Sequence, residues 1–345
     1  MIARMTLGAY RSPATSSLLA IIGAILAGAV LLLLTGHDPV EVYRLIVERG
    51  LLDGDGLTAS LQGMAPLLIV ASGLLLCLRA GIWNIGIDGQ VVIGAIACGV
   101  AAGELAGSTP RALLLVAGIV LGGTAGALWA LTPAVLLTRY GLNEIITTVM
   151  MNYLAFNLVS WLVKGPFSDP GIVTPQTIAV PVVDRLPDIP GTGVHLGLVI
   201  GLIAVAGAWL LFRSTVPGTM LDVLGRNRRA AKHAGFPVNR LIQRAFLVSG
   251  AMAGLAGAVD ILGVFGSFRA SYSPGYGFTA FALVYLARLR ALPMPIFALL
   301  LSALLVGGQS MSRRADVPAE FVSVLEGLLL LFFATAVWLE LRRAP

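Results

Sequence analysis

Apolar runs long enough to cross a membrane recur along almost the whole of this 345-residue sequence. A spanning helix needs about 20 mostly apolar residues, because it must bridge a hydrocarbon core of roughly 30 Å. The candidate runs are 16–35, 60–78, 89–106, 112–136, 143–163, 194–212, 245–266, 276–288, 293–309 and 320–340. They predict an all-α fold, a polytopic transmembrane helical bundle of about ten spans in which some helices are short or broken.

The small charged fraction indicates the same fold class. Only 12% of the residues are charged and 57% are hydrophobic, whereas soluble domains carry about 25% charged residues. A chain of this composition cannot cover a water-facing surface. We therefore expect a single transmembrane domain over residues 1–345, with an external proline-rich loop at about 164–193 and a cytoplasmic loop at about 213–244.

The distribution of basic residues predicts the orientation. With ten spans and the N-terminus inside, 15 of the 23 Lys and Arg residues fall on the cytoplasmic side. This bias has the sign of the positive-inside rule, so both termini are expected in the cytoplasm. It also accounts for the net charge of +6 without nucleic-acid binding. The run 16–35 follows Arg4 and Arg11 and is longer than a usual signal peptide, so we interpret it as a retained span.

The sequence lacks the patterns that carry catalysis or metal binding. His37, His195 and His233 are far apart, and Cys77 and Cys98 both lie in apolar surroundings. There is no G-x-x-x-x-G-K-S/T phosphate-binding loop, so the chain has no such site for ATP. We expect a chain that is not an enzyme, with no catalytic residue, no metal site and no cofactor of its own.

A polar interruption at 79–90 (RAGIWNIGIDGQ) separates two apolar runs. Its glycines permit a broken helix, and Asn84, Asp88 and Gln90 supply hydrogen-bonding groups. Broken membrane helices are tolerated where they line a cavity, and they often form substrate sites. The alternative is an ordinary cytoplasmic loop in which Asp88 caps the following helix. The spacing alone leaves both interpretations open.

Two further polar stretches stand out. In 141–153, Asn143 and Glu144 fit a helix start, whereas Asn152, two turns later, is expected to face a neighbour or a pore because a lipid-facing amide would be unsatisfied. The stretch 267–279, with Tyr276 and Phe278 at its end, breaks the helix pattern again in the second half of the chain. Paired interruptions of this kind point to a transporter site.

Two acidic residues, Asp260 and Glu326, lie inside apolar runs, where ionisable groups are costly and often functional. A secondary transporter, the main alternative function for this chain, would use these two acids to carry a coupling proton. In the simpler alternative, each acid is a structural group within the bundle. A membrane scaffold without transport is a third possibility.

The cytoplasmic loop contains a short amphipathic stretch, 221–235, with glycines at 225 and 235. Its basic residues would suit anionic lipid. Its small face of Ala230, Ala231 and Ala234 suits contact with a protein better, so we favour docking of a cytoplasmic partner.

Four motifs in order resemble one family. Segment 79–90 is similar to R-A-G-x-x-N-I-G-x-E-G-Q, with Asp88 in place of the usual Glu. Segment 141–153 is similar to N-E-V-x-x-T-I-M-x-N-Y, 225–235 matches G-x-N-x-x-A-A-x-x-A-G, and 274–280 resembles G-x-G-F-x-A. The chain thus resembles the permeases of ABC importers for nucleosides and simple sugars, in the branched-chain amino-acid/ribose-type superfamily. It departs at 284–290 (VYLARLR), where the family has A-L-L-G-R-x-N-P.

The resemblance implies a permease of a bacterial cytoplasmic (inner) membrane that works by alternating access. Its partners would be a cytoplasmic ABC ATPase that holds ATP and Mg, a second homologous permease (a heterodimer is favoured), an extracytoplasmic solute-binding protein and membrane lipid. The expected substrate contacts are Asn84, Asp88, Gln90, Asn152, Tyr276 and Phe278. The expected ATPase contacts are Gly225, Asn227, Ala230, Ala231 and Gly235.

Overall fold

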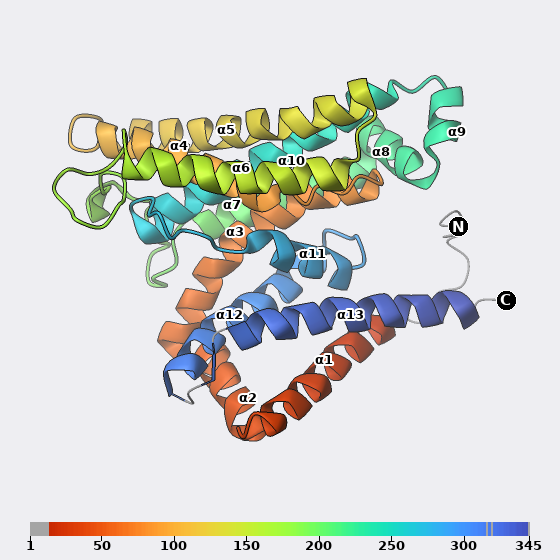
Figure 1. Cartoon of the computed structure of the whole chain (residues 1–345), viewed down its shortest axis with the longest axis horizontal. Coiled ribbons are helices and arrows are strands. Elements are labelled where there is room, and N and C mark those ends of the chain that lie inside the picture. The colour runs from red at the N-terminus through yellow and green to blue at the C-terminus, as the bar shows by residue number, and fades with distance from the viewer. Residues whose placement is uncertain (1–13, 315–316, 319, 344–345) are drawn as a thin grey trace. The chain divides into compact units, whose positions relative to one another are not determined.

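The computed structural model describes residues 14–314, 317–318 and 320–343 (Figure 1). The predicted all-helical architecture is confirmed, since the described residues contain isolated β-bridges but no strand. Arg4 and Arg11, used above for the orientation, lie outside the described residues, as do the side chains of Arg342 and Arg343.

The elements follow one another as α-helices with three short helical turns of other types between them. They are α1 (Ala14–Leu34), α2 (Pro39–Val47), the π-helix η1 (Glu48–Leu52), α3 (Gly54–Arg79), α4 (Ile87–Leu105), α5 (Arg111–Tyr140), α6 (Glu144–Lys164), the 3₁₀ turn η2 (Val182–Asp184), α7 (Gly197–Ser214), α8 (Val216–Arg226), α9 (Arg228–His233), α10 (Val238–Asp260), the π-helix η3 (Ile261–Phe265), α11 (Tyr276–Leu286), α12 (Met294–Arg314) and α13 (Glu320–Arg343).

Each of the ten predicted runs coincides with one of these helices. Among the described residues, seven helices are long and apolar enough to cross a membrane: α3, α4, α5, α6, α7, α10 with η3, and α12. The chain is therefore a multi-pass membrane protein. The full count of ten spans and the cytoplasmic placement of both termini stay predictions. The 11-residue α11 is a short apolar helix.

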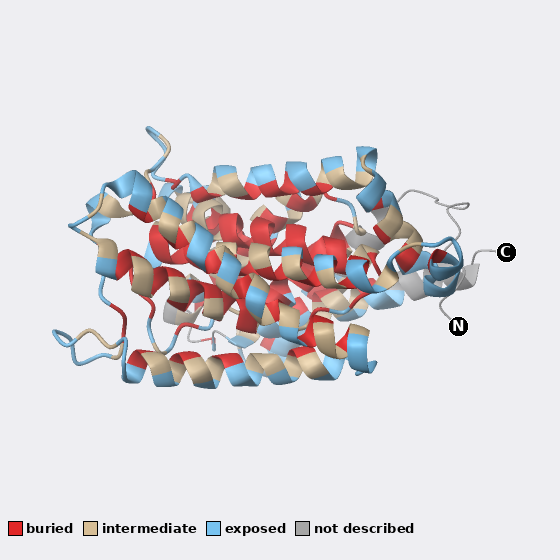
Figure 2. Cartoon of the chain, turned by 90° about the horizontal axis from the view of Figure 1, so that it is seen from above, coloured by how far each residue is buried: buried red, intermediate tan, exposed pale blue. Residues whose placement is uncertain are grey.

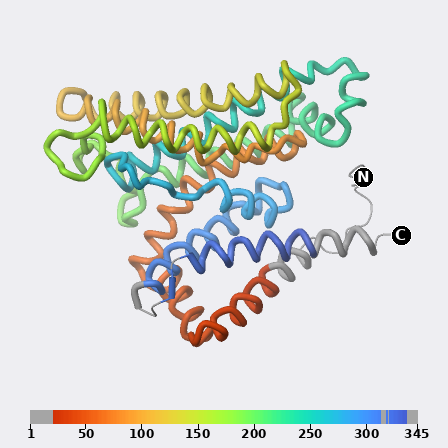
Figure 3. Tube along the Cα trace, in the orientation of Figure 1, coloured from red at the N-terminus to blue at the C-terminus, as the bar shows by residue number. Residues whose placement is uncertain are grey.

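The described residues form two compact units, the first from the segments before residue 65 and after residue 280, the second from 65 to 280. In the first unit, α1 packs along α13, with Gly23 against the ring of Phe332. Figure 3 shows the chain turning sharply between α1 and α2. There Tyr43 donates a hydrogen bond to the carbonyl of Ile25 at 2.7 Å. An apolar cluster of α1, α2, α12 and α13 residues fills this unit.

The second unit is built on close crossings of α4, α5 and α10. Gly94, Gly122, Gly126 and Gly254 lie against one another's backbone at these crossings, and an added Cβ on any of them would collide with main-chain atoms. Small residues let membrane helices approach closely, which replaces the hydrophobic driving force that lipid does not supply. The crossings therefore fix α4 and α10, the helices that carry most of the polar side chains described below.

Burial differs between helices. The apolar windows of α3, α4 and α10 are mostly buried, whereas only 22–28% of the residues in those of α5, α6 and α7 are buried. In Figure 2, buried stripes lie along one face of helices whose opposite faces are exposed. The exposed faces carry large apolar residues such as Leu128, Leu154 and Ile203. Such faces are expected where helices meet lipid.

The departure from the family pattern at 284–290 has a structural counterpart in the first unit. α11 ends at Leu286, and Arg288 and Leu289 both have left-handed backbone, with φ of 54° and 56°. The amide of Leu289 donates to the carbonyl of Val284 at 2.9 Å, which closes the turn. Left-handed backbone costs a residue with a Cβ about 1–2 kcal/mol relative to the right-handed form. The helix therefore ends two residues before the end of the predicted run 276–288, without a glycine to relieve this cost.

Candidate functional site

The first predicted interruption is a break between two helices of the second unit. α3 ends at Arg79 and α4 begins at Ile87, and we call residues 80–86 the amide-held break. The fully buried Asn84 donates its amide to Oε1 of Gln90 and to Oγ of Ser249 in α10, both at 3.0 Å. Gln90 donates back to Oδ1 of Asn84 at 3.1 Å. These side chains satisfy one another and fix the break against α10.

Asn152 of α6 fixes the same break from another direction. Its Oδ1 accepts the backbone N–H of Gly89 at 2.8 Å, and its Nδ2 donates to the carbonyl of Ile85 at 2.9 Å. Gly89 permits this approach, since a Cβ there would press on Asn152 and Ala155. The prediction that Asn152 faces a neighbour is confirmed. Its amide replaces hydrogen bonds that a continuous helix would make itself.

The second interruption lies between η3 and α11, and we call residues 266–275 the carboxylate-held break. Asp260, at the end of α10, is buried, and its Oδ2 accepts the hydroxyl hydrogens of Tyr272 and Tyr276 at 2.7 and 2.9 Å. The ring of Tyr272 also packs edge-on against Phe265, with centroids 5.5 Å apart. The two tyrosines therefore fix the C-terminal half of this break, from residue 272 to the start of α11, against α10.

Asp88 joins the two interruptions. It does not cap its own helix, because α4 has Gly86 at the N-cap position without a side-chain hydrogen bond. Instead its Oδ1 accepts the backbone N–H of Gly277, in the first turn of α11, at 2.7 Å. Carboxylates are stabilised at helix N-termini by the unpaired N–H groups and the helix dipole. The interpretation of Asp88 as the cap of α4 is therefore wrong; it caps a helix from the other half of the chain.

The structure thus brings five of the six predicted substrate residues into one hydrogen-bonded region, namely Asn84, Asp88, Gln90, Asn152 and Tyr276. The sixth, Phe278, lies beside Gly277 on α11 and is 66% exposed. Ser249 belongs to the same region but was missed, because a serine among the Gly and Ala residues of α10 gives no distinctive pattern. Glu326 is buried in α13, which belongs to the first unit.

The loop predicted to be cytoplasmic folds as two helices, α8 and α9, rather than the single amphipathic stretch predicted for 221–235. Asn227 ends α8 and caps α9, because its Oδ1 accepts the amides of Arg229 and Ala230 at 3.0 Å. Gly225 lies inside α8, against the carbonyl of Arg79, where a Cβ would not fit. Gly235 follows α9 with φ of +80°. Of the predicted boundaries, only Gly235 marks an end.

The predicted docking face is only partly exposed. Ala230 and Ala234 are exposed, but Ala231 is fully buried in an apolar cluster that α9 forms with α3, α5, α8 and α10. Ala231 therefore supports α9 from within the chain, and the expectation that it lies on an exposed contact face is wrong. The physical reason is that α9 is short, so the same turn exposes Ala230 and buries Ala231 against the rest of the chain.

Arg79 connects this loop to the amide-held break. Its guanidinium forms a two-pronged ion pair with Asp222 of α8, Nε donating to Oδ1 at 2.7 Å and Nη2 to Oδ2. The same guanidinium lies 3.9 Å above the ring centroid of Phe212 in α7. Bidentate Arg–carboxylate pairs fix geometry as well as charge. α7, α8 and the end of α3 are therefore held together at one side chain.

The loop between α6 and α7, residues 165–196, packs onto the carboxylate-held break. The amides of Val180 and Thr177 donate to the carbonyls of Gly266 and Phe268 at 2.8 and 2.9 Å. His195, at the end of this loop, is buried against Gly263, and its Nδ1 accepts the amide of Gly197 at 3.1 Å. Burial lowers the pKa of His195, and the nearby Asp188 opposes this by raising it.

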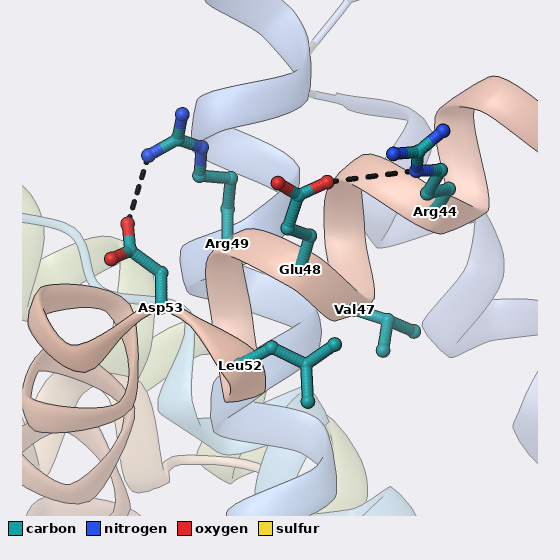
Figure 4. Close-up of a pocket in the computed structure, with 6 residues that line it drawn as sticks. All are labelled: Arg44, Val47, Glu48, Arg49, Leu52 and Asp53. Carbon is teal, nitrogen blue, oxygen red and sulfur yellow. Dashed lines mark hydrogen bonds and ion pairs between the residues drawn. The ribbon is translucent and has the colours of Figure 1, made fainter.

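Two open pockets occur elsewhere in the described part of the chain. One, of about 540 Å³, lies over α2 and η1, where Arg44 pairs with Glu48 and Arg49 pairs with Asp53 (Figure 4). The other, of about 360 Å³, is an apolar hollow between α4, α5 and α6, at Trp129. Neither pocket contains a predicted substrate residue, and surface ion pairs one helical turn apart are an ordinary structural feature.

The family model for the branched-chain amino acid transport system permease component matches residues 56–334. A glucose ABC transporter permease protein of Haloferax volcanii is 33% identical over 95% of this chain and 88% of its own length. A guanosine ABC transporter permease protein of Bacillus subtilis is 27% identical over 92% of both chains. A nucleoside ABC transporter permease protein of Lactococcus lactis is 28% identical over 94% and 91%. A second ABC permease from each of these organisms also matches, at lower identity to this chain than the first.

Proposed function

This chain belongs to the family of branched-chain amino acid transport system permease components, and we propose that it imports nucleosides or related simple sugars. It does so as the membrane subunit of an ATP-driven ABC importer. The solute class is supported by the names of the relatives, which are permeases of glucose, guanosine and nucleoside ABC transporters. A ribose ring and a glucose ring share a polyhydroxylated face, so one kind of site can serve both.

The observation that carries this proposal is the connection from the cytoplasmic loop to the interrupted helices. Arg79 holds Asp222 of α8 at the residue directly before the amide-held break. A displacement of α8 is therefore expected to reach the break and, through Asp88, the first turn of α11. Alternating access requires such a connection, because the ATPase and the solute act at different depths of the membrane.

The partners follow from the same proposal. A cytoplasmic ATPase would hold ATP and Mg and contact the exposed part of α8 and α9, including Ala230 and Asn227. The second homologous permease is proposed to be a different protein, because each of the three organisms above has two distinct matching permeases. An extracytoplasmic solute-binding protein would deliver the solute. The complex would reside in a bacterial cytoplasmic membrane.

Uptake by the reconstituted complex tests this function. The chain, its partner permease and the ATPase are placed in proteoliposomes with the binding protein outside and ATP inside, and uptake of labelled guanosine and of labelled glucose is measured. We expect uptake of at least one of the two solutes that stops without ATP or without the ATPase. Uptake by the isolated chain in response to a pH gradient would instead identify a secondary transporter.

A pair of alanines tests the docking face. Ala230→Asp places a carboxylate on the exposed side of α9, and we expect it to reduce ATP-driven uptake at least tenfold while the complex still binds its solute. Ala234→Asp is the matched substitution at a neighbouring exposed position. Ala231→Asp is not used, because it would bury a charge in the apolar cluster. Full coupling in both variants would contradict the docking assignment.

A further inference from the structure

The polar side chains of the second unit differ in how much hydrogen-bonding capacity they have left. Asn84 uses its Nδ2 twice and its Oδ1 once, and Gln90 uses both ends of its amide. Asn152 is occupied by two backbone groups and Asp260 by two phenol hydroxyls. These residues are occupied in holding the two breaks and offer little to a solute.

Asp88 and Asp260 each keep one carboxylate oxygen without a hydrogen bond in the described part of the chain, but Asp260 is 2% exposed whereas Asp88 is only partly buried. Oδ1 of Asp88 accepts the amide of Gly277, while its Oδ2 accepts no hydrogen bond from the part of the chain that the structure describes. The residue is only partly buried, and Oδ2 is not among the fully buried unpaired side-chain atoms of the described residues, so this oxygen is accessible. A carboxylate within a spanning element is costly unless it is paired or faces a water-filled path. A hydrogen-bond donor for Oδ2 therefore has to come from outside this chain.

The position of Asp88 suits recognition. It lies in the first turn of α4 and touches the first turn of α11, so the N-termini of two helices meet at its carboxylate. Helix N-termini favour negative charge near them, which suits a carboxylate at this position. Gly277 leaves the room for it, because a Cβ at that position would occupy the space of the carboxylate oxygens.

An exposed aromatic ring lies next along the chain. Phe278 directly follows Gly277 on α11 and is 66% exposed, whereas its neighbour Tyr276 is buried and bonded to Asp260. A carboxylate oxygen only accepts hydrogen bonds, and an aromatic ring offers a flat apolar face. A sugar ring presents both complements, adjacent hydroxyl donors at its edge and C–H groups on its face.

From these observations we infer that Oδ2 of Asp88 accepts hydrogen bonds from adjacent hydroxyls of a pentose or hexose, and that Phe278 packs against the same solute. This inference rests on the proposed function and names the part of the solute that is read. The site selects for a vicinal diol. A solute without that diol leaves the carboxylate unpaired, which costs more than the loss of an ordinary neutral hydrogen bond.

The test compares guanosine with 2′,3′-dideoxyguanosine in the reconstituted complex described above, with glucose as a second diol solute. We expect the wild-type complex to take up guanosine at least tenfold faster than the dideoxy analogue at low concentration. In Asp88→Asn the amide oxygen still accepts the Gly277 N–H, but an NH₂ group can stand where Oδ2 was. We expect this variant to lose roughly 10- to 100-fold in guanosine uptake, and its preference for guanosine to fall to near one.

Controls separate recognition from folding. Asp88→Glu keeps the charge and should retain the preference for guanosine. Asp38→Asn changes a carboxylate that also accepts one backbone N–H at a helix start, at 2.8 Å, but lies in the first unit; it should change neither rate nor preference. Phe278→Leu should slow uptake several-fold for both solutes, whereas Phe278→Tyr should not.

The preference ratio does not depend on how much complex is assembled, so reduced yield of a variant leaves it readable. An unchanged preference in Asp88→Asn, with wild-type uptake driven by ATP, would overturn this inference and leave the proposed function standing. Equal wild-type uptake of guanosine and the dideoxy analogue would also overturn it. ATP-driven uptake of neither guanosine nor glucose would overturn both the inference and the proposed solute class.

Discussion

The two helix breaks of the second unit are held by different chemistry. The amide-held break, residues 80–86, is fixed by Asn84, Gln90 and Asn152, whose neutral amides each donate and accept at least one hydrogen bond. The carboxylate-held break, residues 266–275, is fixed by Asp260 and bordered by Asp88. Amides keep the same hydrogen-bonding groups at any ordinary pH, whereas carboxylates change theirs when they gain a proton or a new donor.

This difference separates a fixed part of the site from a responsive one. A saturated amide network holds one geometry, because each lost bond leaves a buried polar group unpaired. The carboxylate-held break depends on acids, phenols and the loop between α6 and α7, and Asp88 retains an accessible oxygen. We expect substitutions in the first break to act mainly on stability and those in the second to act mainly on transport.

The largest effect is expected for Asn152→Leu, which keeps the approximate size of the side chain and removes its amide. The N–H of Gly89 and the carbonyl of Ile85 then lose their partner. Unpaired buried groups cost about 1–3 kcal/mol each, so thermal unfolding of the detergent-solubilised complex should show a loss of about 2–4 kcal/mol. Asn157→Leu, at an exposed position of α6, is the control and should change little. Equal losses in both variants would show that the amide of Asn152 does not hold the break.

A smaller effect is expected for Tyr272→Phe and Tyr276→Phe. Each removes one hydroxyl donor to Asp260 and leaves the other in place. The expected loss is about 1 kcal/mol per variant, with the double variant losing more than the sum because Asp260 then has no phenol partner. Unfolding of single and double variants, with Tyr153→Phe at an exposed position as control, measures this coupling. Strict additivity would show that Asp260 does not join the two tyrosines.

The smallest effect concerns the outer support of the carboxylate-held break and its dependence on pH. Burial lowers the pKa of His195 from the usual value of 6.5, so the docked loop favours the neutral ring. The undocked loop takes up a proton more readily, and docking is therefore complete above about pH 6.5 and weakens as the pH falls below it. Hydrogen exchange should show lower protection factors for the amides of Val180 and Leu186 at pH 5.5 than at pH 8. The variant His195→Asn should flatten this dependence; an equal drop in the variant would exclude His195 as its cause.

The helices were predictable from the sequence because each carries its own apolar run. All ten predicted runs coincide with described helices, and Asn143 caps α6 as its position before an apolar run indicated. The boundaries within 213–244 were less predictable, since α8 and α9 are short and partly exposed. There, one buried alanine and one capping asparagine decide the geometry, and neither residue type reveals its surroundings in a sequence.

The polar region was predictable as a set of residues but not as a set of contacts. Sequence spacing indicated that 79–90 and 267–279 were interruptions, because polar and glycine residues there replace apolar ones. It could not show that Asp88 caps α11 rather than α4, since that contact joins residues 189 positions apart. Likewise, nothing in the sequence distinguishes the saturated Asn84 from the available Asp88, because saturation depends on neighbours from other helices.

The shortness of α11 has a consequence for how the chain is made. Its 11 residues extend about 16 Å, roughly half the thickness of the hydrocarbon core. Such a segment is too short to be recognised by the insertion machinery as a span in its own right, and its first turn is capped by a residue made much earlier, on α4. Its entry into the bilayer therefore depends on helices already in place, so this part of the protein is assembled by its neighbours rather than inserted alone.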